Sequence, residues 1–422
     1  MKEAILFIGL LISIIRCSCS FHEKTDNNLY HIDIEANMHK MQQINLSKFT
    51  KSIEYLPMEI KDNLAFTGIW ECVFSDKYFL AKDISKCLLY DYNGKLISII
   101  GNRGRGPGEY QYVNNVAFGL NKIYLQSLRD LMEYGFDGSF HDIHRNLFFF
   151  KSYYVGKWLP LNDSLFFGKI ETIVGNEPCK ALIFDLNGNT VKEFKNYIIF
   201  QREKPLSSET ERHANIYRFQ NEIFFKELHN DTLFYLSEQL ELIPKYVIDL
   251  GQYTVPVSIR KLLIIPENNY MTVNNVFQTS DYLFLDTNFG SHFPARRLTP
   301  IKLPIFNIES YYNTQDVLGI FDRRNKELIF CSPTSTDNPL FTTGFYNDVD
   351  AGPRFFPKVQ VDDSTMVMWV DSKQLKDHIA SEEFKNAKPL YPEKKEALKH
   401  LADSLSEYDN PVLMFVTFKS EK

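Results

Sequence analysis

The feature of this sequence that most restricts its fold is a β-hairpin pattern that recurs along the chain. Each copy has two short runs of apolar and aromatic residues, one on either side of a turn. Such runs around an Asn-Gly or Asp-Gly pair are the strongest local signal for a hairpin with a two-residue loop. Three turns carry such a pair: Asn93-Gly94, Asp137-Gly138 and Asn187-Gly188. Weaker copies span residues 233–242 and 319–330.

The spacing of these turns predicts a repeat of the length of a propeller blade. The turn centres lie near residues 94, 138, 188, 239 and 325, so successive turns are 44, 50, 51 and 86 residues apart. Four-stranded propeller blades repeat about every 40–50 residues. The long gap is either one blade with an insertion or two blades of which one has a degenerate hairpin, and residues 281–286 supply a strand inside it.

A ring of blades explains the repeat better than a stack of β-sandwich domains. Each blade leaves an apolar face that only its neighbours can cover, so the repeats must stack and close. No linker separates sandwich-sized units between residues 46 and 370. The aromatic content of 14% favours strands. We therefore predict an all-β fold, a β-propeller of four-stranded antiparallel blades, that occupies residues 46–422.

The pattern changes after residue 370. Residues 392–406 are predicted to be helical, because Leu398, Leu401 and Leu405 recur at helical spacing after Pro392. Residues 412–418 form an almost continuous apolar run, which indicates a strand. We expect a C-terminal helix docked on the propeller rim and a strand that returns to a blade. The alternative is a helix that binds a partner protein.

The N-terminus predicts export and a lipid anchor. The apolar run 4–15 is too short to span a bilayer comfortably and fits the core of a signal peptide. Cys19, preceded by Ser18, resembles the lipidated cysteine of a bacterial lipobox, whereas Cys17 follows Arg16. We interpret 1–19 as a lipoprotein signal peptide and 20–45 as a flexible tether. The alternative is an ordinary secretory signal or an uncleaved anchor.

Export permits disulfides, yet the strand register argues against one between Cys72 and Cys87. If residues 76–77 and 83–85 are turns, both cysteines face Ala81 from opposite sides. They would then lie about 9–10 Å apart, beyond the reach of a disulfide. We predict that Cys72, Cys87, Cys179 and Cys331 are free and mostly buried thiols.

Charge and motifs exclude several functions. The net charge of −6, without a basic block, argues against a nucleic-acid partner. The sequence has neither a Gly-x-Ser-x-Gly elbow nor a His-Glu-x-x-His motif. We expect no cofactor and no metal site, and we consider an enzyme less favoured than a binding protein.

A glycine-rich segment carries a family resemblance. Residues 101–110 read Gly-Asn-Arg-Gly-Arg-Gly-Pro-Gly-Glu-Tyr. This run resembles a signature of the six-bladed β-propeller lipoproteins of Bacteroides-type bacteria. That family is related to the NHL-repeat propellers. Segments 51–59, 230–234 and 409–413 also resemble that family. The resemblance implies a propeller of six blades that is exported as a lipoprotein. It implies little chemistry, because fold does not determine function.

The same segment is the candidate binding site. Its glycines permit backbone conformations that turn amides towards an anion, and arginines add charge-assisted hydrogen bonds. The candidate residues are Arg103, Arg105, Gly106, Gly108, Glu109 and Tyr110. A carboxylate or sulfate on a glycan would suit this loop. The alternative is a tight corner between blades in which Glu109 pairs with an arginine.

Three further segments are weaker candidates. His141 and His144 would point to opposite faces of a strand, so they are not expected to share a metal. Residues 348–354 form an acidic loop for which Ca²⁺ binding is the less favoured interpretation. The aromatics in 148–154 either stack on sugar rings or, as we prefer, pack between blades.

Two functional hypotheses follow. The favoured one is a lipid-anchored propeller that binds a glycan, a peptide or a partner protein. It would lie in the cell envelope, at the outer membrane, and face the periplasm or the surface. The alternative is a hydrolase or lyase that acts on polysaccharide in the central funnel. Paired carboxylates with raised pKa values in the funnel would favour the enzyme.

Overall fold

The structure is a computed structural model. It describes residues 29–61, 64–66, 68–150, 153–202, 214–261, 270–292, 299–303, 308–312, 316–332 and 343–420. The predicted signal peptide, Cys19 and the first part of the predicted tether lie outside these residues. No helix in the described part of the chain is both long and apolar enough to cross a membrane.

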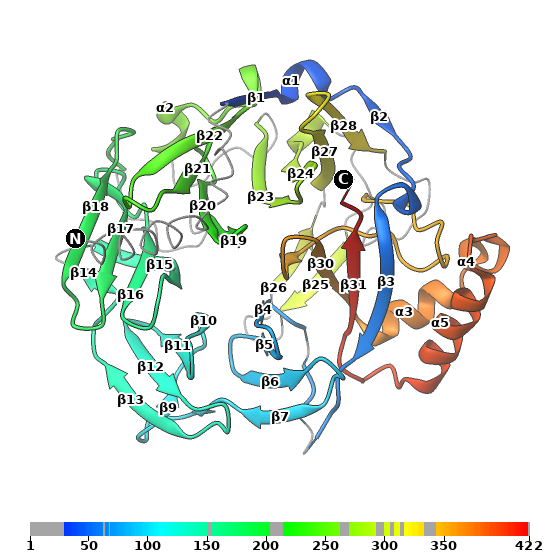
Figure 1. The fold of residues 1–422 in the computed structure, drawn as a ribbon, viewed down its shortest axis with the longest axis horizontal. Helices are drawn as coiled ribbons and strands as arrows, with labels where there is room; N and C mark the ends of the chain where they lie inside the picture. Colours follow the sequence, from blue (N-terminus) through cyan, green and yellow to red (C-terminus); the bar gives the residue numbers. More distant parts are fainter. Residues whose placement is uncertain are drawn as a thin grey trace, which may run out of the picture.

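Six small sheets stand around a central axis as the blades of a propeller (Figure 1). From the axis outwards, blade 1 has β4 (Glu71–Phe74), β5 (Tyr78–Lys82), β6 (Cys87–Asp91) and β7 (Leu96–Ile99). Blade 2 has β10 (Asn115–Phe118), β11 (Ile123–Ser127), β12 (Asp130–Tyr134) and β13 (Phe140–His144). Blade 3 has β15 (Tyr153–Pro160), β16 (Leu165–Ile170), β17 (Cys179–Asp185) and β18 (Thr190–Lys195), and β14 (Phe149–Phe150) pairs with the start of β15.

The second half of the ring repeats this order. Blade 4 has β19 (Ala214–Phe219), β20 (Glu222–Glu227), β21 (Thr232–Leu236) and β22 (Leu242–Asp249). Blade 5 has β23 (Thr272–Gln278), β24 (Tyr282–Asn288), β27 (Asp316–Asp322) and β28 (Glu327–Cys331). Blade 6 has β29 (Val359–Gln360), β30 (Thr365–Val370), β31 (Val412–Phe418) and β3 (Thr50–Pro57). The predicted six-bladed propeller is confirmed.

The hairpin turns are confirmed as the connections between the third and fourth strands. Gly94, Gly138 and Gly188 all have φ near +80°, a region that favours glycine. A Cβ atom on Gly138 would lie 2.3 Å from the carbonyl oxygen of Ile99 on blade 1. The glycine therefore serves both the turn and the close approach of two blades.

The 86-residue gap between turns is one blade with an insertion. A hairpin of β25 (Thr299–Leu303) and β26 (Ile308–Tyr312) stands between β24 and β27, which pair directly with each other. The shorter helical segments are α1 (Ile34–Asn37), α2 (Val257–Arg260) and the 3₁₀ turns Leu46–Lys48, Gly251–Tyr253 and Gly290–His292.

The propeller begins earlier in the chain than predicted, at β1 instead of residue 46. β1 (Tyr30–Asp33) pairs in parallel with β22 of blade 4, and β2 (Met41–Gln42) pairs in parallel with β28 of blade 5. β3 then pairs with β31 and closes the ring. The tether prediction is therefore wrong for residues 30–45, because this polar segment supplies outer strands whose partners lie far away in the sequence.

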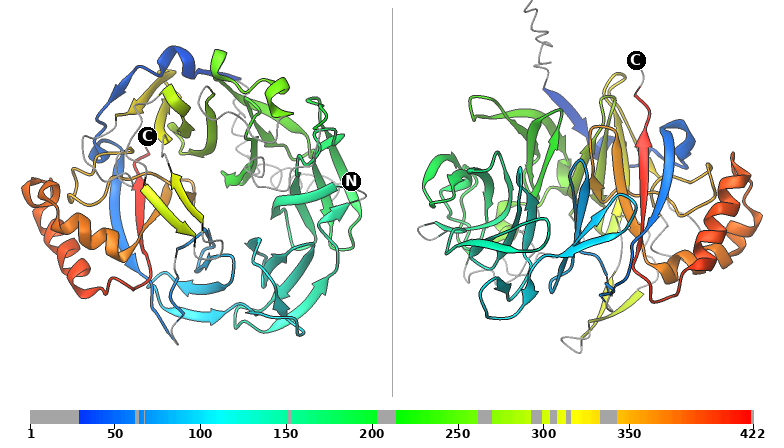
Figure 2. Two further views of the ribbon diagram at one scale, coloured as in Figure 1. Left: turned by 180° about the vertical axis from the view of Figure 1, so that it is seen from behind. Right: turned by 60° about the horizontal axis from the view of Figure 1, so that its bottom comes forward.

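The predicted helix and final strand are confirmed within an excursion from blade 6. α3 (Ser372–Ala380), α4 (Glu382–Asn386) and α5 (Pro392–Ser404) lie between β30 and β31, on the outside of the ring (Figure 2). Leu375, Phe384 and Leu398 are buried in the same apolar cluster as Val412 of β31. The helices therefore pack on the propeller rim, as expected.

The four predicted thiols are free and buried. Cys72 lies opposite Ala81, as predicted, but Cys87 lies opposite Lys82, one residue from the predicted register. Burial raises the pKa values of Cys72, Cys87 and Cys331 well above the ordinary thiol value, so these side chains behave as apolar core groups.

Candidate functional site: the central channel

The inner strands of the six blades enclose a channel. Its volume is about 1050 Å³, and its walls come from the inner strands and from the turns that follow them. Every blade repeats the same path of antiparallel strands, so all inner strands start at one end of the channel. Residues at the starts of these strands are therefore brought together from segments far apart in the sequence.

One end of the channel gathers three lysines, one glutamate and one tryptophan. We call it the lysine end and define it by Trp70, Glu71, Lys82, Lys157 and Lys358, all of which line the channel. Trp70 and Glu71 stand at the start of β4, and Lys358 directly precedes β29. Lys157 lies on β15, and Lys82 ends the second strand of blade 1.

Lys82 lies at the end of the second strand of blade 1, and the equivalent position in every other blade holds a polar or aromatic residue. The six equivalent residues are Lys82, Gln126, Lys169, Lys226, Asp286 and Trp369. Three of them donate to a carbonyl oxygen of the next blade: Lys82 to Val113 at 3.2 Å, Gln126 to Val155 at 3.3 Å and Lys226 to Val273 at 3.4 Å. These buried polar groups thus join neighbouring blades instead of remaining unpaired.

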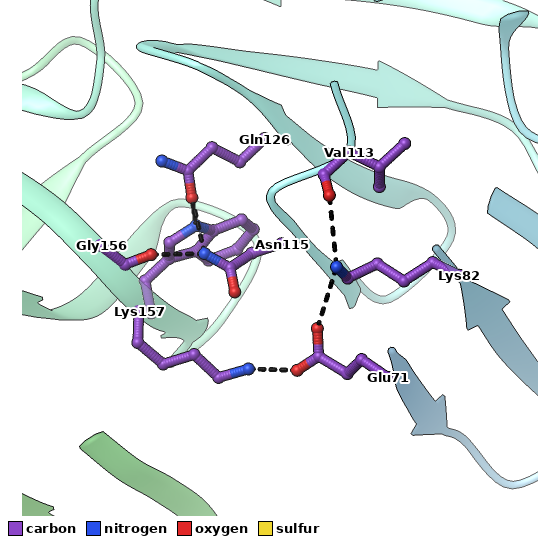
Figure 3. A network of polar contacts seen from close by, with 8 residues as sticks. Glu71, Lys82, Val113, Asn115, Gln126, Gly156 and Lys157 are labelled. Carbon is purple, nitrogen blue, oxygen red and sulfur yellow. Dashed lines mark hydrogen bonds and ion pairs between the residues drawn. The ribbon is translucent and has the colours of Figure 1, made fainter. Parts of the chain in front are cut away.

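Glu71 links blade 1 to blade 3 across the lysine end (Figure 3). Its Oε1 contacts the Nζ of Lys157, and its Oε2 lies 3.6 Å from the Nζ of Lys82. Burial raises the pKa of Glu71, but the ammonium groups, Lys157 foremost, outweigh burial and hold that pKa below its ordinary value. Burial lowers the pKa of Lys82. Glu71 is therefore an ionised partner of two lysines and is unsuited to donate a proton near neutral pH.

Amide groups fix the backbone beside Lys157 (Figure 3). The Nδ2 of Asn115 donates to the Oε1 of Gln126 at 2.8 Å and to the carbonyl oxygen of Gly156. The same Gln126 oxygen accepts from the Nε1 of Trp158 at 2.7 Å. Because both neighbours of Lys157 are held by blade 2, the lysine side chain starts from a fixed point in the channel wall.

Lys358 and Trp70 border the lysine end from blades 6 and 1. The Nζ of Lys358 lies 4.6 Å from the centroid of the Trp369 ring. Burial lowers the pKa of Lys358, and the carboxylate of Asp371 opposes this shift. Trp70 lines the channel with 60% of its surface exposed. An exposed indole of this kind offers an apolar face to a ligand.

The channel is positive although the chain is negative. The described residues that line it include four cations, Lys82, Lys157, Arg218 and Lys358, and two anions, Glu71 and Asp163. The whole chain has a net charge of −6. Cavity walls of one dominant sign concentrate ligands of the opposite sign.

The predicted glycine-rich site lies elsewhere. Its residues form a short parallel pair of β8 (Asn102–Arg103) and β9 (Glu109–Tyr110), and none of them lines the channel. The amide of Gly106 donates to Glu109 Oε2 at 2.7 Å. The loop thus turns this amide towards its own carboxylate, and Arg103 and Arg105 are exposed.

The contacts of this loop also fit a tight corner between blades 1 and 2. Gly108 has φ of +72°, and its carbonyl oxygen accepts from the hydroxyl of Tyr134 at 3.0 Å. Tyr110 is buried between blades 1 and 2. Arg103 lies over the Tyr112 ring, 5.6 Å from its centroid, and not against Glu109. These contacts do not test whether the loop binds an anion, so that role stays a prediction.

The weaker candidates are engaged in local contacts. His144 lies 3.1 Å from Glu133, whereas His141 lies 3.2 Å from Ser139. Asp350 accepts from the hydroxyl of Tyr55 at 3.1 Å and is almost fully buried. Among the described residues, no three His, Cys, Asp or Glu side chains are grouped so that they could hold a metal.

The aromatic segment after residue 147 packs mainly within the protein. Phe148 is buried and stacks on Trp158 at 5.2 Å between ring centroids. Phe150 packs against Phe184 at 5.0 Å. Phe149 is partly exposed and lies under the guanidinium group of Arg129.

Sequence reasoning missed a pair of carboxyl groups in blade 5. Asp286 Oδ2 accepts from Asn275 at 2.9 Å, and Asp316 Oδ1 accepts from Asn288 at 2.8 Å. Burial, followed by the charge of Asp316, raises the pKa of Asp286 to about 7. Burial also raises the pKa of Asp316. Asn275 lines the channel, but neither carboxyl group does.

A repeated sequence signal marks the channel residues. The second strands of blades 1, 3 and 4 read Phe-Leu-Ala-Lys, Phe-Phe-Gly-Lys and Phe-Phe-Lys, and each lysine occupies the equivalent position. Asn-Asn-Val starts the inner strand region of blades 2 and 5. Alignment of the blades by their second strands would have found these positions.

The family of the chain is shown by its match over residues 29–417 to a domain of unknown function, DUF4934. The chain belongs to this family. No curated protein matches it. The DUF4934 match begins just before β1, which agrees with the place of that strand in the propeller.

One solved structure supports the fold, and a second is reported beside it. A Bacteroides fragilis protein named as exported is 15% identical, with a TM-score of 0.65 over 93% of this chain and 100% of the other. A DUF4221 member from Bacteroides vulgatus is 10% identical, with a TM-score of 0.48 over 88% of this chain and 97% of the other. The first likeness supports the propeller fold, and the relation to NHL repeats stays a prediction.

Proposed function

We propose that this DUF4934 protein is an exported propeller of the cell envelope that binds an extracellular ligand in its central channel. The observation that carries the proposal is the 1050 Å³ channel, with its excess of cations and its exposed Trp70. Ligand sites are typically concave and combine apolar surface with a few placed polar groups. The apolar N-terminal run supports export, and Cys19 supports a lipid anchor.

Binding is better supported than hydrolysis. A glycoside hydrolase needs two carboxyl groups that face the same substrate, one of them protonated. The carboxyl pair with raised pKa values, Asp286 and Asp316, lies outside the channel lining. Glu71 does line the channel, but two lysines keep it ionised. These positions favour ligand binding over polysaccharide cleavage in the channel.

The test compares two exposed aromatic residues. Trp70→Ala should abolish or strongly weaken ligand binding measured by calorimetry, because the indole lines the channel. Tyr408→Ala is the matched control, since Tyr408 is 86% exposed and lies outside the channel lining. Equal binding by both variants would place the site elsewhere, and the glycine-rich loop would then be the next candidate.

A further inference from the structure

We infer that the channel ligand is an acidic oligosaccharide whose carboxylates bind at the lysine end. This inference rests on the proposed function and specifies its ligand. Three observations carry it: the ratio of charges at this end, the exposed indole, and the size of the channel.

The channel lining at the lysine end has fewer carboxylates than ammonium groups. Both oxygens of Glu71 are used, Oε1 by Lys157 and Oε2 by Lys82. Lys358 contacts the Trp369 ring and interacts electrostatically with Asp371, which does not line the channel, but among the described residues no carboxylate lies within 4 Å of its ammonium group. The channel lining at this end thus holds three ammonium groups and one carboxylate, which is paired with two of them. A ligand carboxylate between Lys157 and Lys358 would supply the missing charge and form charge-assisted hydrogen bonds.

The neighbouring surface suits a sugar ring. Trp70 is 60% exposed inside the channel lining, so its indole face is available for stacking on the apolar face of a sugar.

The size of the channel indicates more than one sugar. A drug-sized ligand fills a pocket of about 300–1,000 Å³, and this channel holds about 1050 Å³. Arg218 lies at the opposite ends of the inner strands, beside the carbonyl oxygens of Pro160 and Leu161. An oligosaccharide with repeated carboxylates would reach the cations at both ends of the channel. A single acidic sugar would reach those at one end only.

The experiment measures binding of the mature full chain to a panel of oligosaccharides by calorimetry. The panel contains uronate oligomers of several linkages, sulfated oligomers, neutral oligomers of matched length, and oligoglutamate. We expect uronate oligomers to bind and neutral oligomers to bind at least tenfold more weakly. Lys358→Gln should weaken uronate binding about tenfold, as for one lost charge-assisted contact. Lys399→Gln, an exposed lysine on α5, is the matched control.

Glu71→Gln is the decisive second variant. Removal of the competing carboxylate should strengthen uronate binding, although it removes two ion pairs. If Glu71→Gln does not fold, the Lys358→Gln comparison still tests the inference. Tighter binding of sulfated oligomers than of uronates would overturn the assignment of carboxylate as the recognised group, and tighter binding of oligoglutamate would overturn the assignment of sugar.

The remaining outcomes separate this inference from the proposed function. Neutral oligomers that bind as tightly as uronates, and that Trp70→Ala abolishes, would overturn the acidic ligand but retain the channel as the site. Absence of binding by the whole panel would overturn both proposals.

Discussion

The buried carboxyl groups of Asp286 and Asp316 in blade 5 predict a stability that depends on pH. In the unfolded chain Asp286 has an ordinary pKa near 4, whereas in the folded chain burial raises its pKa to about 7. Between these two values the folded state holds a proton that the unfolded state has lost. The free energy of unfolding therefore falls as pH rises from about 4 to 7.

Asp286→Asn should flatten this pH dependence. The wild-type protein should lose about 1 kcal/mol or more of stability between pH 5 and pH 8, and the variant should lose clearly less. Urea unfolding at the two pH values measures both. Asp403→Asn, on the surface of α5, should keep the wild-type dependence. If the free energy of unfolding of Asp286→Asn falls with pH as steeply as that of the wild type, other groups cause the pH dependence.

A second residue-scale prediction concerns the blade turns. Gly138→Ala should destabilise the protein by about 1–3 kcal/mol, because φ there is +83° and a Cβ would lie 2.3 Å from the Ile99 oxygen. Gly68→Ala is the matched control, since a Cβ there meets no atom within 4 Å. Thermal unfolding of the two variants measures the difference. Equal midpoints would show that the two blades move apart at little cost.

At the scale of elements, the sequence predicted the strands that carry a local signal and missed β1 and β2, which carry none. The Asn-Gly and Asp-Gly hairpins and β31 were recognisable because turn chemistry and apolar runs are local signals. β1 and β2 were not, since they are only four and two residues long. Only the folded ring brings them beside β22 and β28, about 200 and 290 residues later.

The N-terminal strands should contribute to stability as parts of blades 4 and 5. Ile32 and Ile34 are almost fully buried, and each should contribute roughly 1.5–3 kcal/mol. A chain that begins at residue 46 should therefore unfold at a lower temperature than one that begins at residue 29. It should also aggregate more readily, because the outer edges of β22 and β28 lose their partners. Equal thermal midpoints would restore the view of this segment as a tether.

At the scale of the whole molecule, the ring was predictable but its channel was not. The repeat length and the family resemblance together predicted six blades. The lysine end depends on how blades 1, 3 and 6 meet at the axis, which no local pattern encodes. Glu71 and Lys157 are 86 residues apart in the sequence and on blades that are not neighbours. The glycine-rich loop attracted attention because its motif is contiguous, whereas the channel residues are dispersed.

The predicted lipid anchor concerns the whole molecule and rests on Cys19, which lies outside the described residues. If Cys19 carries the lipid, the propeller is held at a membrane through the segment that leads into β1, at the outer edge of blade 4. Cys19→Ser should then move the protein from the membrane fraction to the soluble fraction without a change in its unfolding temperature. Cys17→Ser is the matched control and should leave the protein in the membrane fraction. The reverse result would assign the lipid to Cys17, and retention of both variants would favour an uncleaved anchor.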